Sequence, residues 1–304
     1  MQPLVFLLGF LFLLASAGCH REPQPEKPRT RPQAAKLPPA YDSLPRVTEQ
    51  YYRVGSSTYC LLIISAPGKE LPCSPIDSIV VLAATPEDSL YRRVSLLEEA
   101  NGLCLADEAP DAPPIAVEAV AQGQHHVLIL RTWAGGNAGS SFTTFVWLLP
   151  EGKLVIEQEG LSRTFRLTPD SLLALAIYDA FLPDDIEVPN ASLAYPVASF
   201  YVLEPALSPQ QLQQVWNEFL ERERQRAMRE YESDHGLLWA AVDYIVYSRL
   251  LGRPAEAETF LQRALREAAA TPEERAYLRA AARNRITPTV ATWDIILQAP
   301  RRLP

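Results

Sequence analysis

The chain has 304 residues, of which 48% are hydrophobic and 21% are charged, and its formal net charge is −8. This composition supplies enough apolar side chains for a core and two folding units, and it excludes wholesale disorder. The 13 glycines and 27 scattered prolines exclude a collagen-like chain, and the only long apolar run lies near residue 1, which excludes a polytopic membrane protein. The negative charge and the lack of a recognition motif predict no nucleic-acid partner.

The first residues have the pattern of a signal peptide. Residues 4–14 are apolar and would span only about 16 Å as a helix, against roughly 30 Å of bilayer hydrocarbon. The small residues 15–18 follow, and then Cys19. This arrangement resembles the signal peptide of a bacterial lipoprotein.

The resemblance implies that residues 1–18 are removed and that Cys19 becomes the new N-terminus, with a thioether-linked diacylglycerol and an acylated amine. His20 stands where an inner-membrane retention signal often has Asp, so the resemblance implies attachment to the outer membrane of a diderm bacterium. Ordinary secretion with an unmodified Cys19 is the alternative.

Residues 19–46 are predicted to form a proline-rich tether. They contain seven prolines and almost no large apolar side chains, so they cannot bury enough surface to offset the entropy lost on ordering. In the polyproline II form, at about 3.1 Å per residue, they would reach roughly 80 Å. Their net charge of +3 would favour anionic lipid headgroups, and a purely solubilising role is equally compatible.

The remaining chain divides near Ser208. Residues 47–207 carry 8 basic and 20 acidic side chains, whereas residues 208–304 carry 14 basic and 13 acidic ones. The apolar pattern changes from period 2 to period 3.6 at the same place. We therefore predict an α+β protein, with an antiparallel β sandwich or open barrel over residues 47–207 and a helical bundle over residues 208–304.

Eight short apolar runs with turn residues between them predict the strands of the β domain. They are residues 51–54, 59–65, 78–83, 115–121, 127–133, 142–149, 154–159 and 163–167. Gly152 predicts a hairpin turn between two of them. Thr168, Pro169 and Asp170 resemble a helix start and predict a helix over residues 172–181, and one further strand is predicted at residues 199–203.

Four helices are predicted in the second domain. Ser208 and Gln211 form a capping box before an apolar stripe, residues 237–251 are apolar almost all round, and further helices follow at 255–268 and after Thr271. Five of these residues resemble half of a tetratricopeptide repeat, although a generic bundle fits better because no second copy of the period is present. They are Gly252, Ala257, Leu261, Ala264 and Leu265.

The cysteines of the β domain allow one disulfide in an oxidising compartment. Cys60 lies within an apolar strand and is predicted to be a buried thiol, whereas Cys73 and Cys104 lie near predicted loops and could pair. Neither the histidines nor the cysteines have the spacing of a zinc site, and no cofactor motif is present, so we expect no metal and no cofactor.

A glycine-rich loop between two predicted strands is the candidate ligand or partner loop. It contains Trp133, Gly135, Gly136, Asn137 and Ser140, whose glycines permit close approach and whose indole offers a stacking face. It is neither a P-loop nor a nucleophile elbow, because the lysine and the following helix are missing. A flexible hairpin loop is the simpler interpretation.

Arginines recur every four residues at Arg275, Arg279 and Arg283, and we interpret them as a solvated helix face.

Two functional hypotheses follow from the whole sequence. The first is a lipid-anchored binding or assembly module of the cell envelope that contacts an envelope protein through its helical domain. The second is an extracytoplasmic hydrolase or carbohydrate-active domain, in which two carboxylates face each other across a cleft. Its candidate carboxylates are Glu118, Glu157, Glu159 and Asp179.

Overall fold

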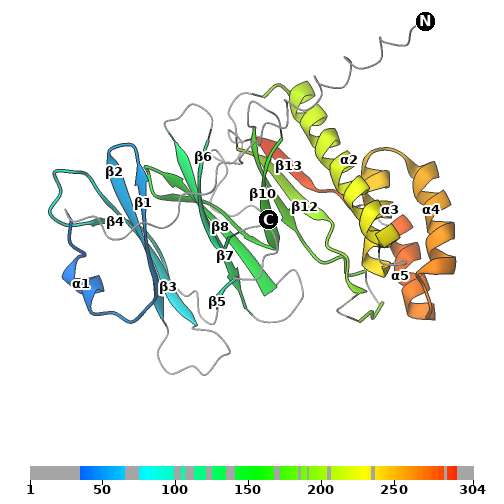
Figure 1. The fold of residues 1–304 in the computed structure, drawn as a ribbon, viewed down its shortest axis with the longest axis horizontal. Helices are drawn as coiled ribbons and strands as arrows, with labels where there is room; N and C mark the ends of the chain where they lie inside the picture. The colour runs from blue at the N-terminus through cyan, green and yellow to red at the C-terminus, as the bar shows by residue number, and fades with distance from the viewer. Residues whose placement is uncertain are drawn as a thin grey trace, which may run out of the picture.

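The computed structural model describes twelve segments of the chain. They are residues 35–65, 75–98, 104–106, 113–120, 125–134, 141–167, 172–183, 186–189, 192–203, 207–233, 237–283 and 286–292. None of the helices in these segments is both long and apolar enough to cross a membrane. The predicted α+β class is confirmed, because sheets come first and helices follow (Figure 1).

Three sheets lie one behind another. The first sheet is an antiparallel meander of β1 (Arg46–Val54), β2 (Ser57–Ser65), β3 (Ile76–Ala84) and β4 (Arg92–Leu97). The second sheet contains β5 (Cys104–Leu105), β6 (Ile115–Ala119), β7 (His126–Trp133), β8 (Phe142–Leu149) and β9 (Lys153–Glu159). The third sheet contains β10 (Leu161–Arg166), β11 (Leu173–Tyr178), β12 (Val197–Val202) and β13 (Thr289–Thr292). All eight strands predicted before residue 168 are present.

Helices cover the third sheet at the end of the stack that lies away from the first sheet (Figure 1). They are α2 (Pro209–Ser233), α3 (Leu238–Leu250), α4 (Pro254–Glu267) and α5 (Pro272–Arg283). The predicted capping box at Ser208 is confirmed, and so is the helix predicted after Thr271. Ser208 and Gln211 exchange backbone-to-side-chain hydrogen bonds of 2.9 and 3.3 Å, and Thr271 and Glu274 do the same at 2.8 and 3.1 Å.

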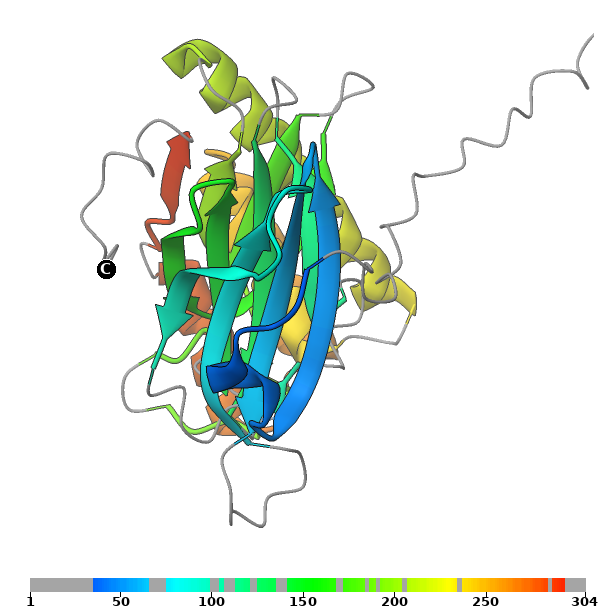
Figure 2. The same cartoon turned by 90° about the vertical axis from the view of Figure 1, so that its left-hand side faces the viewer.

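Each interface between layers is filled by apolar side chains. The sheets lie one in front of another when the molecule is viewed from the first sheet (Figure 2). Alternate strand residues point to opposite faces, so the central strands bury both of their faces. Trp147 of β8 packs toward the first sheet, Val146 packs toward the third sheet, and Phe200 of β12 packs against Phe219 of α2. The hydrophobic core is therefore layered. One layer lies between the first and second sheets, one between the second and third sheets, one between the third sheet and the helices, and one among the helices.

The helix predicted over residues 172–181 is wrong, because β11 occupies residues 173–178. All six of its side chains are buried. Leu175 faces the second sheet, whereas Ala174 and Ala176 face the helices. An apolar run that is buried on both sides has no period that distinguishes a strand from a helix, so only its place between two layers selects the strand.

The end of the predicted tether belongs to the folded protein. Ala35 and Leu37 are buried on the outer face of the first sheet, and Lys36 forms backbone hydrogen bonds with Ser89 and Tyr91. The short helix α1 (Pro39–Asp42) follows, and β1 begins at residue 46. The folded protein therefore includes residues 35–46, which the sequence assigned to the tether.

The region expected to be only helical also supplies a strand. β13 runs parallel to β12, with Ser199 opposite Thr289, and so joins the edge of the third sheet after α5. The chain thus returns to the third sheet after the helices. The helices are therefore connected to this sheet on both sides, through β12 before them and β13 after them.

Gly160 lies between β9 of the second sheet and β10 of the third sheet, in close contact with β11. It has φ of +128°, and a Cβ atom built there would lie 2.5 Å from a methyl carbon of Ile177 and 2.7 Å from the carbonyl oxygen of Tyr178. Gly55 also has a positive φ, of +61°, but its Cβ would meet nothing within 4 Å. We expect Gly160→Ala to lower the free energy of unfolding by about 1–3 kcal/mol more than Gly55→Ala. Urea unfolding of both variants measures this, and equal losses would contradict the close approach.

Candidate functional site

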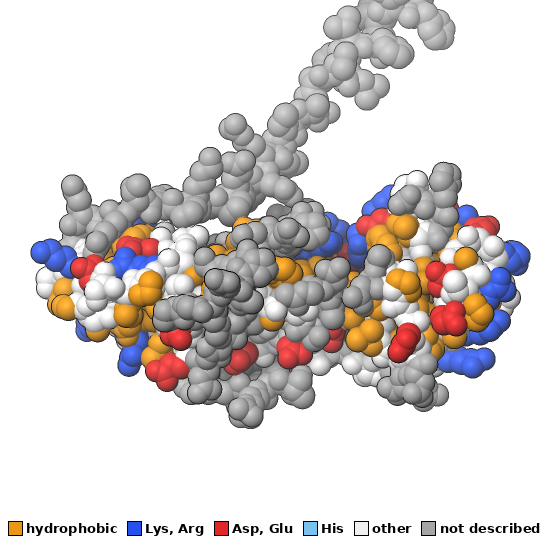
Figure 3. All heavy atoms as spheres, turned by 90° about the horizontal axis from the view of Figure 1, so that it is seen from below, with side chains coloured by type: hydrophobic (Ala, Val, Ile, Leu, Met, Phe, Trp, Pro, Cys, Tyr) orange, Lys and Arg blue, Asp and Glu red, His pale blue; other side chains and the backbone are white. Residues whose placement is uncertain are grey.

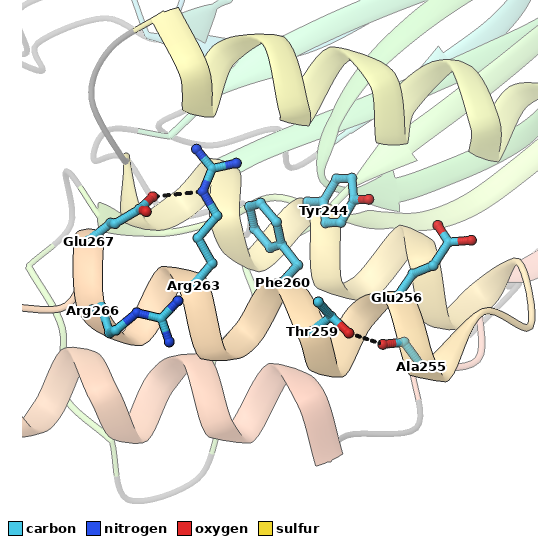
Figure 4. A pocket seen from close by; sticks show the side chains of 8 residues that line it. All are labelled: Tyr244, Ala255, Glu256, Thr259, Phe260, Arg263, Arg266 and Glu267. Carbon is cyan, nitrogen blue, oxygen red and sulfur yellow. Dashed lines mark hydrogen bonds and ion pairs between the residues drawn. The ribbon is translucent and has the colours of Figure 1, made fainter.

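A trough runs along α4, and Tyr244 of α3 lies at its base (Figure 4). Its volume is about 630 Å³, which lies within the range of small-ligand pockets. We call this feature the trough. Its lining residues are Tyr244, Ala255, Glu256, Thr259, Phe260, Arg263, Arg266 and Glu267.

Three aromatic rings connect the helices at the floor of the trough. The ring centroids of Tyr244 and Phe260 are 4.3 Å apart, and those of Phe260 and Tyr231 of α2 are 4.9 Å apart. Such tilted and edge-on contacts are favourable beyond the area that they bury. α3 is apolar almost all round and is therefore enclosed by α2, α4 and α5, which brings Tyr244 to the base of the groove.

A guanidinium closes one end of the trough. Arg224 of α2 donates to the hydroxyl of Tyr244 and to Glu256, both at 2.9 Å, and to Glu221 at 2.7 Å. Its carbon Cζ lies 5.4 Å from the Tyr244 ring centroid, a cation–π distance. The hydrogen bond from Arg224 lowers the pKa of Glu221, so this carboxylate is charged at neutral pH.

A second guanidinium closes the other end. Arg263 of α4 lies 5.3 Å above the ring of Tyr231 and donates to Glu267 at 2.8 Å. The hydroxyl of Tyr231 donates to the same carboxylate at 3.0 Å. Burial, followed by the hydrogen bond to Glu267, raises the pKa of Tyr231 to about 12, so the phenol stays protonated and keeps donating.

Arg266 differs from the other two arginines. It is exposed, points from α4 toward α5, and forms no ion pair with any residue that the structure describes (Figure 4). The trough therefore has an aromatic floor, two neutralised charged ends and one available cation. This arrangement suits the binding of an apolar side chain of a partner, because apolar centres with polar rims are typical of protein interfaces.

A buried charge cluster lies next to the trough and connects α3 to α2 through Asp243, the neighbour of Tyr244. Arg226 donates to Glu223 at 3.0 Å, lies 3.7 Å from Asp243 of α3, and also donates to Glu230. Glu223 and Asp243 are each 2% exposed. The hydroxyl of Tyr178, at the end of β11, lies 3.4 Å from Glu223. One guanidinium thus joins two buried carboxylates and fixes the helix pair on the third sheet.

Burial is the main cause of the perturbed acidity of Asp243. It raises the pKa of this carboxyl to about 7, although Arg226 acts in the opposite direction. Burial likewise raises the pKa of Tyr178 and Tyr247 well above the ordinary value. These groups have no access to a substrate because they are enclosed, so the cluster positions the helices rather than reacting.

The structure describes only part of the predicted glycine-rich loop. Trp133 ends β7 and is half-buried, and the backbone amide of Ala134 donates to Ser141 at 2.7 Å across the base of the loop. Gly135, Gly136, Asn137 and Ser140 lie outside the described residues, and so does Cys19. The ligand-loop interpretation stays a prediction.

Cys104 is disulfide-bonded and lies opposite Trp133 in the register of β5 and β7. Cys73 lies outside the described residues, so its pairing with Cys104 stays a prediction. Cys60 is a buried thiol in β2, as expected. Sequence reasoning missed Arg131 of β7, which is 1% exposed and donates to Ser162 of β10 at 2.9 Å, joining the second and third sheets.

The carboxylates of the hydrolase hypothesis do not face one another. Glu118 lies on β6 and pairs with Arg166 at 2.9 Å, whereas Glu157 and Glu159 are exposed on β9, at the opposite edge of the second sheet. Asp179 follows β11 in the third sheet and accepts a hydrogen bond from the next backbone amide. Among the described residues there is also no group of three His, Cys, Asp or Glu side chains that could hold a metal ion.

The trough was not predicted, because Tyr244 and Phe260 read as core residues in the sequence. The alternation of acidic and basic side chains at spacings of three and four residues along α4 was the available signal. It indicates a charged face but not which helix lies beside it. Only packing shows that Tyr244 of α3 completes the lining and that Arg224 and Tyr231 of α2 contact it.

Comparisons with known proteins identify no family. No family model matches the chain, and no curated protein matches it. Two crystal structures of the GH43_1 enzyme from Xanthomonas citri, one of them complexed with xylose, align at 11% identity with TM-scores of 0.25 and 0.26. The alignments cover 52% of this chain and 50% of those chains, so the chain matches about half their length. TM-scores of this size do not indicate a shared fold.

Asp243 gives the protein a specific dependence on pH. A carboxyl whose pKa is raised on folding binds a proton in the folded state that the unfolded state has lost, so its contribution to stability falls as pH rises from about 4 to about 7. We expect Asp243→Asn to remove this decline, which amounts to at most about 1.4 kcal/mol per pH unit. Chemical unfolding at pH 5 and pH 7 measures the change. Glu118→Gln serves as the control, and parallel profiles for wild type and Asp243→Asn would contradict the assignment.

Proposed function

We propose that this chain is a lipid-anchored protein of the bacterial cell envelope, attached to the outer membrane through Cys19, that binds an envelope protein through the trough on its helical end. The main support for this proposal is the trough. Its aromatic floor, charged ends and volume of about 630 Å³ fit an inserted apolar side chain with a polar surround.

The order of the layers supports a presenting role. About 16 residues separate Cys19 from Ala35, where the described chain begins on the outer face of the first sheet, and these could extend roughly 50 Å. The helices lie at the other end of the stack (Figure 1). A chain anchored in this way would carry its helical end away from the lipid surface, toward a partner.

Replacement of the proposed lipidation site tests the anchor. We expect Cys19→Ser to abolish the acylated N-terminal peptide in mass spectrometry of protein from its native host and to release the chain from the outer-membrane fraction. The wild-type chain should remain in that fraction after a high-salt wash, because fatty acyl chains rather than charges hold it. A bare thiol at Cys19 in the wild-type protein would contradict the anchor.

Filling the trough tests partner binding. Thr259 is exposed on α4 within the trough, whereas Gln262 is exposed on the same helix outside it. After crosslinking in envelopes of the native host, we expect Thr259→Trp to reduce the recovery of the crosslinked partner at least ten-fold. Gln262→Trp should leave it unchanged, because Gln262 is not one of the lining residues.

Two results would contradict partner binding through the trough. One is the same loss of the crosslinked partner in both variants. The other is the absence of any discrete adduct of the wild-type chain. Both variants place a large apolar side chain at an exposed position of one helix, so a difference between them reports the trough itself.

A further inference from the structure

Three arginines on α5 form an exposed row. Arg275, Arg279 and Arg283 are exposed, whereas Tyr277 and Leu278 on the other side of the helix are buried in the helical core. The three guanidiniums form no ion pair with any side chain in the described segments. We call them the α5 row. Basic side chains are also visible at the rim of the helical end (Figure 3).

The α5 row contrasts with the arginines of α2 and α4. Arg224, Arg226 and Arg263 each have a glutamate partner three or four residues away on their own helix. On α5 the residues at spacing four are like charges, which destabilise a helix. The C-terminal position of Arg283 offsets only part of this, through the helix dipole. The row is therefore not explained by the stability of its own helix.

The carboxylates of α5 do not neutralise the row. Both lie in the first turn, and Glu274 accepts the backbone amides of Ala270 and Thr271 at 2.7 and 2.8 Å as part of the cap. After Glu274 the helix carries no acidic residue, and the small side chains of Ala276 and Ala280 flank the arginines. The three neighbouring guanidiniums are thus accessible. Each offers paired N–H donors in one plane, the geometry that best matches a carboxylate.

The spacing of the row matches an extended chain. Residues four apart on a helix are about 6 Å apart along its axis, so the row spans about 12 Å. Alternate residues of an extended peptide are about 6.6–6.8 Å apart and point the same way. Three alternate carboxylates of a peptide can therefore each meet one guanidinium.

We propose that the α5 row is a docking surface for an extended acidic segment of a partner protein that carries Asp or Glu at alternate positions. This inference goes beyond the trough, because it assigns a second surface and the chemistry of its ligand. The positive charge of the row favours a negatively charged extended segment. The arginines are about 6 Å apart along the helix axis and alternate residues of an extended peptide are about 6.6–6.8 Å apart, so alternating carboxylates fit the row better than a block of consecutive ones.

A fluorescein-labelled peptide of four Glu-Thr repeats is the probe, titrated with the detergent-solubilised full chain and followed by fluorescence anisotropy. We expect Arg279→Gln to weaken binding at least three-fold, and the triple replacement of the α5 row by Gln to weaken it at least ten-fold. A peptide with the same composition in separate blocks of Glu and Thr should bind at least three-fold more weakly. Added salt should weaken all binding, since charges carry it.

The control removes the same charge from the first sheet. Arg53, Arg92 and Arg93 are exposed there, and their triple replacement by Gln should leave the affinity within two-fold of wild type. Equal losses in both triple variants, or equal affinity for the alternating and the block peptide, would overturn the proposal. Binding of vesicles containing phosphatidylglycerol through the α5 row, without binding of the peptide, would also overturn it in favour of a lipid surface.

Thr259→Trp separates this proposal from partner binding through the trough. It should leave peptide binding unchanged, because Thr259 lies on α4 within the trough and not on α5. Loss of peptide binding in this variant would place the peptide in the trough and overturn the α5 docking surface. Loss of the crosslinked partner without loss of the peptide would leave the two surfaces independent.

Discussion

Burial of the third sheet on both of its faces is the constraint on which the rest of the structure depends. One face of β11 packs leucine and isoleucine against the second sheet, and the other presents Ala174 and Ala176 to the helices. These small side chains leave room for Phe200 and Phe219, whose ring centroids are 4.6 Å apart at the contact with α2. Without this two-sided strand, the β layers and the helices would have no common core, and neither α2 nor α3 would be held in place.

The buried charges fix the relative rotation of α2 and α3, which apolar packing alone does not set. Hydrophobic contact is not directional, so it brings α2 and α3 together without setting their relative rotation. Arg226, between Glu223 and Asp243, sets that rotation, because an unpaired buried charge would be costly. The rotation in turn decides that Tyr244 faces α4 beside Phe260. The floor of the trough is thus coupled to the charge cluster through Asp243 and Tyr244, two consecutive residues of α3.

The helical end uses its arginines in two ways. On α2 and α4 they pair with glutamates and lie over aromatic rings, and so they connect α2 with α3 and α4 beside the trough. Single exposed ion pairs contribute little, but here each guanidinium joins two helices and one ring, so the contacts support one another. On α5 the arginines have no such partners among the described residues. The proposed functions follow this division, with the trough as a shaped site and the α5 row as a charged one.

The sequence by itself determined the features that rest on local physics. Ser208 and Thr271 mark helix starts because their side chains bond backbone amides within a few residues, and short apolar runs between turn residues, such as residues 127–133, mark strands. Only the tertiary structure decided that residues 173–178 form a strand, that Ala35 and Leu37 lie on the first sheet, and that Tyr244 of α3 joins α4 in lining the trough. In each of these cases the same side chains are compatible with two local structures, and the choice depends on partners far away in the chain, which no local pattern encodes.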